Sequence, residues 1–255
     1  MSATETGTVL ITGAAKRIGR ALALDFAARG WRVGVHYGRS AAEAESLVAE
    51  IETAGGRAAA LRAELGALDE TEALLPACEA ALGPVTCLIN NASRFERDTA
   101  ADMKAADWEA HQNINLRAPV FLARALASRL PQGASGNVIN MIDQRVWRLT
   151  PEFFSYTISK SGLWTATRTL AQALAPLVRV NAIGPGPTLA SKRQSAEGFA
   201  RQQAAVLLGR GPELEEICAA ARFILKARAM TGQMIALDGG QHLAWQTPDV
   251  LDIGE

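Results

Sequence analysis

Residues 7–37 carry the pattern that most limits the folds open to this chain. An apolar, β-branched run at 7–12, Gly-Thr-Val-Leu-Ile-Thr, predicts a buried parallel strand. The turn TGAAKRIG follows, and apolar residues then recur at helical spacing until Gly30, where a second strand-like run begins. Strand, glycine turn, helix and strand form a βαβ unit of the dinucleotide-binding type, in which glycines let the backbone approach a pyrophosphate at the helix N-terminus. A turn with a structural role alone is the alternative.

The remainder of the chain continues this alternation without a linker or a break in composition. The expected strands lie at 7–12, 31–37, 57–65, 85–89, 136–142, 178–183 and 232–240. The expected helices beyond the first lie at 41–54, 69–82, 153–175 and 213–226, with another running through 111–115. The sequence therefore predicts one α/β domain over residues 1–255, a doubly wound Rossmann fold with a mainly parallel seven-stranded sheet.

Charge and cysteine content narrow the classes of partner. The chain has 26 basic and 26 acidic residues, so no net charge attracts nucleic acid or an anionic membrane surface. No apolar stretch has the length of a membrane span and the N-terminus lacks signal-peptide features, so we expect a cytoplasmic protein that acts on a small molecule. Cys78, Cys87 and Cys218 are scattered and lack metal-ligand spacing, so we expect buried thiols and no metal site.

The turn TGAAKRIG resembles the TGxxxGxG motif of the short-chain dehydrogenase/reductase family, with Arg17 in the place of the middle glycine. An arginine there is similar to the pteridine reductase branch of the family. The resemblance extends from residue 7 to about residue 242. It implies that Gly13, Arg17, Ile18 and Gly19 bind the cofactor, with the Arg17 guanidinium near both its phosphates and the substrate.

The residues after the second expected strand bear on which dinucleotide binds. An NAD enzyme is expected to place a carboxylate there for the ribose 2′-hydroxyl. The sequence is instead His36-Tyr37-Gly38-Arg39-Ser40, without an acidic residue. Arg39 and Ser40 can bind a 2′-phosphate, so the sequence favours NADP(H), with His36 and Tyr37 beside it. Alternatively, Arg39 is a solvated loop residue and Ser40 only caps the next helix.

Three further segments resemble family motifs that contact the dinucleotide. Glu64-Leu65 stands where the family commonly has Asp-Leu or Asp-Val beside the adenine, and the run at 90–93 resembles NNAG with a serine in place of glycine. The run GPGPT at 184–188 matches the PG motif, whose threonine is placed to contact the nicotinamide carboxamide. The resemblance thereby implies these further cofactor contacts: Glu64, Leu65, Asn91, Ala92, Ser93, Pro185, Gly186 and Thr188.

Tyr156 and Lys160 are four residues apart in an expected helix, and so on one face, one turn apart. An ammonium beside a phenol favours the phenolate and lowers the tyrosine pKa, which makes the phenol a usable acid or base near neutrality. Taken alone, such a pair more often decorates a solvated helix face. The family resemblance assigns both residues to catalysis and to the cofactor, and implies that Asn115 holds a water that links the lysine to solvent.

Asp143 follows the strand expected at 136–142, at the sheet edge where ligands sit in open α/β folds. Most family members have serine at this position, 13 residues before the tyrosine, whereas an Asp-Tyr-Lys set resembles the pteridine reductases. A carboxyl group can bind and protonate a ring nitrogen or amino group if partial burial raises its pKa. An aspartate that only forms an Asx-type turn is the alternative.

Substrate recognition is implied by the same resemblance. Phe95 lies two residues after Ser93, where a phenyl ring opposite the nicotinamide would clamp a flat heterocycle, although it can also be a core aromatic under a loop. The expected substrate contacts are Arg17, Ser93, Phe95, Asp143 and Tyr156. Residues 189–212 correspond to the family's substrate lid, the tail at 243–255 can reach a neighbouring subunit, and a homotetramer, a dimer of dimers, is expected.

The sequence thus predicts an NADPH-dependent reductase of a pterin-like heterocycle, with proton donation from Tyr156 and Asp143. Two alternatives remain open at this stage. One is a reductase of the same fold and cofactor that acts on another carbonyl substrate. The other is a protein that senses a dinucleotide without catalysis.

Overall fold

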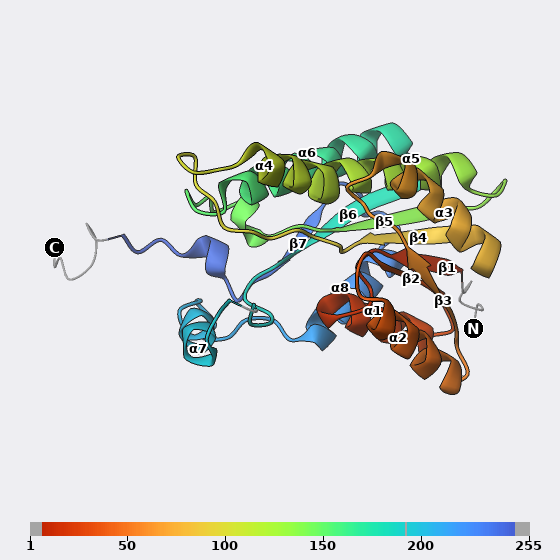
Figure 1. Ribbon diagram of the computed structural model, residues 1–255, viewed down its shortest axis with the longest axis horizontal. Coiled ribbons are helices and arrows are strands. Elements are labelled where there is room, and N and C mark those ends of the chain that lie inside the picture. Colours follow the sequence, from red (N-terminus) through yellow and green to blue (C-terminus); the bar gives the residue numbers. More distant parts are fainter. Residues whose placement is uncertain (1–6, 192, 248–255) are drawn as a thin grey trace.

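Seven strands form one sheet through the centre of the computed structural model, which describes residues 7–191 and 193–247 (Figure 1). Every neighbouring pair of strands is parallel. In spatial order the strands are β3 (Arg57–Arg62), β2 (Arg32–Tyr37), β1 (Thr8–Ile11), β4 (Val85–Asn90), β5 (Gly136–Met141), β6 (Val178–Pro185) and β7 (Met234–Leu237). The predicted single-domain Rossmann fold is therefore confirmed, and the strand order reverses between β1 and β4.

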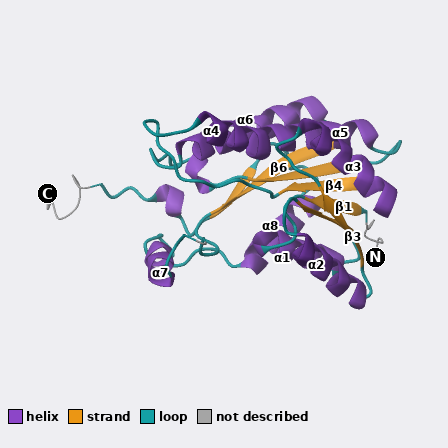
Figure 2. Cartoon of the chain, viewed as in Figure 1, coloured by secondary structure: helices purple, strands orange, loops and turns teal. Residues whose placement is uncertain are grey.

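Helices cover both faces of this sheet (Figure 2). One layer contains α3 (Leu68–Leu82), α4 (Ala105–Gln112), α5 (Ala118–Arg129) and α6 (Phe154–Leu174). The opposite layer contains α1 (Arg17–Ala27), α2 (Ala41–Thr53) and α8 (Leu214–Lys226). A further helix, α7 (Ala196–Ala204), lies apart from both layers, beyond the end of the sheet (Figure 1). Right-handed crossovers between parallel strands produce this arrangement of layers.

The core consists of two main apolar clusters, one on each face of the sheet. Alternate residues of β1 belong to different clusters: Val9 and Ile11 pack under α1 and α8, whereas Leu10 packs under α3 and α5. This follows from the two-residue period of a strand, and it explains why a strand buried on both faces is continuously apolar. Burying each such aliphatic side chain stabilises the fold by about 1.5–3 kcal/mol.

Helix α6 carries the functional residues because one of its faces is buried against the sheet. Lys160, Leu163, Thr167 and Ala171 follow one another at helical spacing on that face, and all four are buried. It packs against β6, and Tyr156 and Lys160 of its first two turns bond to residues at the carboxyl end of β5, Asp143 and Met141. The N-terminal turn of α6 is thereby held at the edge of the sheet where ligands are expected.

The structure also meets two other expectations from the sequence. All three cysteines are buried free thiols, and burial raises the pKa of each to about 12. The helix expected through 111–115 is present, although a π-helical turn at Asn113–Arg117 joins α4 to α5 within it. Among the described residues, no helix is both long enough and apolar enough to span a bilayer.

Candidate functional site

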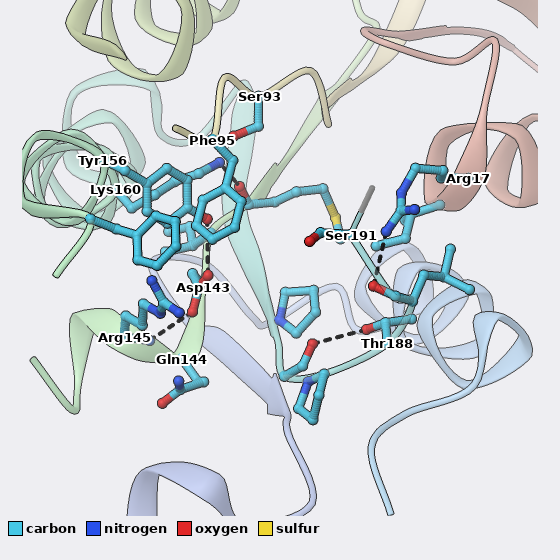
Figure 3. A pocket seen from close by; sticks show the side chains of 18 of the residues that line it. Arg17, Ser93, Phe95, Asp143, Gln144, Arg145, Tyr156, Lys160, Thr188 and Ser191 are labelled. Carbon is cyan, nitrogen blue, oxygen red and sulfur yellow. Dashed lines mark hydrogen bonds between the residues drawn. The ribbon is translucent and has the colours of Figure 1, made fainter. Parts of the chain in front are cut away.

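Two adjoining cavities lie at the carboxyl ends of β1, β4, β5 and β6, where the strand order reverses. Their volumes are about 680 Å³ and about 720 Å³. The first is bounded by Asp143, Tyr156 and Lys160, and the second by the glycine turn and the end of β2. Both are bounded by Arg17, Ile18, Asn91, Ser93 and Phe95, so the two form one extended crevice. Figure 3 shows the residues that line the first cavity. This is the place where dinucleotides bind in doubly wound folds.

The turn between β1 and α1 has room only for glycine at two positions. Gly13 has a φ of +63°, and a Cβ on it would lie 2.9 Å from the Cα of Ala92. A Cβ on Gly19 would lie 2.3 Å from the carbonyl oxygen of Gly13. The Asn91 side-chain amide donates to that same oxygen over 3.0 Å and to the Thr12 carbonyl over 2.9 Å. The close packing of the turn brings its backbone to the border of the second cavity.

His36 holds this turn from the end of β2. Its Nδ1 accepts a hydrogen bond from the Gly13 amide over 3.0 Å, and its Nε2 lies 3.0 Å from the Ala63 carbonyl. Burial lowers the His36 pKa to about 4, so the ring is neutral at physiological pH. Both ring nitrogens are occupied, and His36 therefore shapes the cavity that it borders by fixing Gly13 in place.

Of the other residues predicted to distinguish NADP(H) from NAD(H), Arg39 borders the second cavity and Tyr37 and Ser40 do not. Arg39 is exposed and borders the second cavity, together with Glu64, Leu65 and Ala92. Tyr37 packs against the apolar cluster under α1 and borders neither cavity. Ser40 occupies the N-cap position of α2, but its side chain forms no capping hydrogen bond, and it borders neither cavity.

Arg17 adopts a left-handed backbone, with a φ of +55°. Glycine reaches this conformation without steric cost, which explains a glycine at the same place in the TGxxxGxG motif. The guanidinium points from the turn toward the segment after β6 and donates to the carbonyls of Leu189 and Ala190 over 3.0 Å and 2.8 Å (Figure 3). Arg17 therefore connects the glycine turn to the first residues of the predicted lid.

The carboxyl of Asp143 and the hydroxyl of Tyr156 meet in the first cavity. Tyr156 donates its phenolic proton to Oδ2 of Asp143 over 2.9 Å (Figure 3). The other carboxyl oxygen accepts the backbone amide of Arg145 over 2.9 Å, which is the Asx-type turn considered as an alternative above. The two interpretations of Asp143 are compatible, because the turn fixes the carboxyl in the orientation that reaches the phenol.

The expected effect of Lys160 on Tyr156 is wrong for this structure. The ammonium donates to the Met141 carbonyl over 2.7 Å and lies 5.8 Å from the centre of the Tyr156 ring. Burial, together with the neighbouring Asp143, instead raises the pKa of Tyr156 well above 10. Burial also raises the pKa of Asp143 and lowers that of Lys160 to about 8. The phenol is therefore protonated at neutral pH.

Asn115 borders neither cavity, because protein groups use its whole side chain. The amide nitrogen donates to the Arg94 carbonyl and to Ser159 Oγ, each over 3.0 Å. The amide oxygen accepts from the Arg94 amide over 2.8 Å and from Ser93 Oγ over 3.3 Å. Its side chain thereby ties the loop after β4 to α6, and the water predicted beside it stays a prediction. Its π-helical turn is a type of distortion common at functional sites.

Phe95 is one layer of an aromatic stack at the wall of the first cavity. Its ring is parallel to that of Phe153, with centroids 4.4 Å apart and planes at 4°, and it meets the edge of Tyr156 at 4.7 Å. The guanidinium of Arg145 lies 4.6 Å from the Phe153 centroid on the stack. Phe95 is thus a wall of the cavity, as predicted, and not a core aromatic (Figure 3).

The segment after β6 closes the crevice from the other side. Pro185, Gly186 and Thr188 border the first cavity, as predicted, and Thr188 Oγ1 donates to the Gly186 carbonyl over 3.1 Å. Arg193, within the predicted lid at 189–212, forms an ion pair with Glu96 and donates to the Phe95 carbonyl. Of the predicted tail at 243–255, the structure describes residues 243–247. The prediction that the tail reaches a neighbouring subunit lies outside the described residues.

Several residues that border the first cavity were missed by sequence reasoning. They come from the turn after β5, the residue before α6, the lid and the last turn: Gln144, Arg145, Phe153, Arg193, Phe199, Gln202 and Gln241. The lid residues carry no motif of their own.

A buried polar network behind the site was also missed. Ser155 Oγ donates to Asp98 and lies 2.7 Å from His111 Nδ1, and His111 Nε2 accepts the Glu96 amide over 3.2 Å. Ser155 immediately precedes Tyr156. This network therefore anchors the first turn of α6 to the loop that carries Phe95, and it fixes the distance between the phenol and the aromatic wall.

Known proteins that resemble this chain do so over nearly its whole length. A family model described as short chain dehydrogenase matches residues 7–206. FolM alternative dihydrofolate reductase 1 from Brucella suis, solved in complex with NADP, is 49% identical with a TM-score of 0.93 and covers 95% of this chain and 98% of its own. Its Brucella canis counterpart, also with NADP, is 47% identical with a TM-score of 0.91, covering 96% and 98%. A 3-oxoacyl-[acyl-carrier-protein] reductase from Synechocystis is 33% identical over 247 residues, 94% of this chain and 98% of that protein.

Proposed function

The chain belongs to the short-chain dehydrogenase family, and from this we propose that it is an NADPH-dependent reductase of a pterin-like heterocycle. As a member of the family it is an oxidoreductase, and its cofactor is NADP(H). The alternative of a dinucleotide sensor without catalysis is therefore set aside. The observation that supports this choice of substrate is the hydrogen bond between Tyr156 and Asp143. Most family members are expected to have a serine at the position of Asp143.

The residues around the crevice fit a phosphorylated dinucleotide. The close-packed turn at Gly13 and Gly19 would hold the pyrophosphate at the start of α1. Arg39 would hold the 2′-phosphate, and no carboxylate stands at the end of β2 to repel it. Lys160 would hold the nicotinamide ribose at the first cavity. When bound there, NADPH supplies the hydride that the reduction consumes.

Proton transfer is assigned to the chain's own residues. The reduction of a C=N unit consumes one hydride and one proton. The Tyr156 hydroxyl would donate that proton to the nitrogen of the C=N unit, and the Asp143 carboxyl, which also binds the ring side, would return a proton to the phenolate through the hydrogen bond between them. Burial keeps the Asp143 pKa raised, so the carboxyl retains its proton at higher pH than an exposed aspartate. The Lys160 ammonium lies near the Tyr156 ring. It would stabilise the negative charge that develops on the phenol oxygen when the proton leaves.

A pterin-like ring suits this cavity better than an aliphatic ketone does. The aromatic wall of Phe95 and Phe153 offers a flat surface of matching shape, and stacking on such a ring contributes about 0.5–1.5 kcal/mol beyond burial. A carboxyl group offers an acceptor oxygen to the N–H groups of an aminated ring, and an aliphatic ketone has no N–H group to match it. The Brucella relatives, named as alternative dihydrofolate reductases, agree with a substrate of this class.

Reduction of another carbonyl substrate is the second candidate. It is favoured by the likeness to the Synechocystis 3-oxoacyl-[acyl-carrier-protein] reductase. The two candidates are separated by mixing the purified protein with NADPH and a panel of biopterin, dihydropterins, folate and simple ketones, and following the absorbance of the reduced nicotinamide. Turnover of pterins without turnover of ketones is expected. Turnover of ketones alone would reject the pterin proposal and leave the family assignment intact.

The choice of NADPH over NADH is expected to depend on Arg39. Replacing Arg39 by aspartate removes a charged donor from the 2′-phosphate and adds repulsion, so the ratio of kcat/KM for NADPH to that for NADH should fall by about 10- to 100-fold. Steady-state kinetics with both cofactors measure this ratio. Arg57→Asp is the matched control. Arg57 is exposed at the beginning of β3, at the amino-terminal end of the strands, whereas Arg39 lies at their carboxyl end. An unchanged ratio in Arg39→Asp would show that another residue reads the phosphate.

The homotetramer, the cytoplasmic location and the movement of residues 189–212 as a lid remain predictions. Six residues of that segment border the first cavity: Leu189, Ser191, Arg193, Gln194, Phe199 and Gln202. Their position supports a lid, because a substrate in the cavity would be covered by them.

A further inference from the structure

Arg145 has a buried guanidinium nitrogen that nothing in the described protein satisfies. Its Nη1 is inaccessible to solvent and has no hydrogen-bond partner among the described residues. A guanidinium contains only donors, and a buried donor without an acceptor costs more than an ordinary hydrogen bond contributes. The Arg145 side chain as a whole is half-buried, forms no hydrogen bond with a described residue and borders the first cavity beside Asp143, so its accessible N–H groups can donate to an acceptor on a bound molecule.

The guanidinium is held in place before any substrate binds. It lies on the ring of Phe153, with Cζ 4.6 Å from the centroid, and 5.4 Å from the centroid of Phe95. The backbone amide of the same residue is bonded to Asp143 Oδ1. Figure 3 shows Arg145 beside Asp143. A donor fixed by cation–π contact and by its own backbone turn loses little entropy on binding.

The other arginines around this cavity already have partners. Arg97 is paired with Glu152 and Arg193 with Glu96, and Arg17 donates to the carbonyls of the lid. Arg97 and Arg193 therefore form neutral pairs toward the mouth. Arg145 forms no ion pair with any described carboxylate within 4.0 Å, including that of Asp143. Arg145 lies beside Asp143, at the end of the cavity that also holds the Tyr156 hydroxyl.

We propose that Arg145 is a specificity-determining residue that donates its free N–H to the oxo oxygen of a lactam-type heterocycle. Asp143 and Arg145 present an acceptor and a donor side by side, and a lactam edge, with N–H next to C=O, presents the complement. An amino group in place of the oxo group would set donors against donors. The inference rests on the proposed function and adds a chemical feature that the substrate ring must carry.

The test compares two ligands that differ at this one group. Pterin and 2,4-diaminopteridine are titrated into the protein saturated with NADP⁺, with tryptophan fluorescence or calorimetry as the measurement. The wild-type protein should bind pterin at least about tenfold more tightly. In Arg145→Met, which keeps the length of the side chain and loses its donors, pterin affinity should fall about 10- to 100-fold. Affinity for the diamino compound should stay within about threefold, because it never used the donor.

Arg148→Met is the control, because Arg148 is exposed on the same turn and donates to the Gln241 carbonyl over 3.2 Å outside the cavity. It should retain the wild-type preference. NADP⁺ binding and the Tm of each variant establish that it is folded. Equal loss of both ligands in Arg145→Met, or equal binding of both by the wild type, would overturn the role of Arg145 while pteridine binding itself still supports the proposed function. A wild-type protein that binds neither ligand would overturn both proposals.

Discussion

Replacing Tyr156 by phenylalanine is expected to lower kcat for NADPH-dependent reduction by about 10²- to 10⁴-fold, the usual contribution of a positioned general acid. The ring is buried, and its edge meets Phe95 at 4.7 Å, so phenylalanine preserves the packing and removes only the hydroxyl. The Asp143 carboxyl loses its 2.9 Å donor in the same variant. Substrate and cofactor affinity should change much less than kcat, because the hydroxyl acts chiefly when the proton moves.

Stopped-flow single turnovers and NADPH fluorescence titration measure the two effects separately. Thr157→Val is the matched control: Thr157 is the next residue of α6, it is buried, and its hydroxyl has no hydrogen-bond partner among the described residues. Its loss should leave kcat within about twofold, since valine has nearly the same shape and the hydroxyl that it removes forms no hydrogen bond. If Tyr156→Phe retained wild-type kcat, the proton would have to come from another group, and Asp143 would be the first to examine.

Replacing Asp143 by asparagine is expected to lower kcat/KM for a pterin by about 10²- to 10³-fold. Asparagine keeps the shape and can still accept the Arg145 amide, but it cannot deliver a proton. The pH profile should change as well. Because burial raises the Asp143 pKa, wild-type activity that needs the protonated carboxyl should fall as the pH rises through that raised value. The variant should lack this decline.

A second decline should remain in the asparagine variant. Lys160 has a pKa lowered to about 8 by burial, so its charge is present below this pH and is lost above it. Rates measured from acid to alkaline pH in both proteins test the assignment. Asp69→Asn, on the exposed first turn of α3, makes the same chemical change away from the cavities and should leave the profile unaltered. Identical profiles in wild type and Asp143→Asn would show that the carboxyl does not supply the proton.

The fold and the centre of the site could be predicted because they depend on local patterns. Continuous apolar strands, glycines at a tight turn and helical spacing led to the seven-stranded sheet and its ligand-binding edge. The meeting of Asp143 and Tyr156 was expected from the resemblance to the Asp-Tyr-Lys set of the pteridine reductases, and it agrees with the placement of a strand end and the next helix start at the same edge of the sheet.

What sequence could not predict was the choice of partner for each polar group. Spacing brought Lys160 near Tyr156, but the ammonium is bonded to the Met141 carbonyl on β5 and the phenol is bonded to Asp143. His36 was expected beside the cofactor, but it has both nitrogens occupied by backbone groups from two other segments. The partner of a polar group depends on how segments far apart in the chain pack together. The same packing buries the group and thereby shifts its pKa.

At Phe153, directly before α6, the stability of the fold and the binding of a substrate favour different residues. Its backbone has a φ of +55°, a conformation that costs a bulky residue about 1–2 kcal/mol. Glycine would recover that energy and lose the ring that supports both Phe95 and the Arg145 guanidinium. A lineage selected only for heat resistance would therefore drift toward a smaller residue here, whereas one selected for its substrate would keep the aromatic and tolerate the strain.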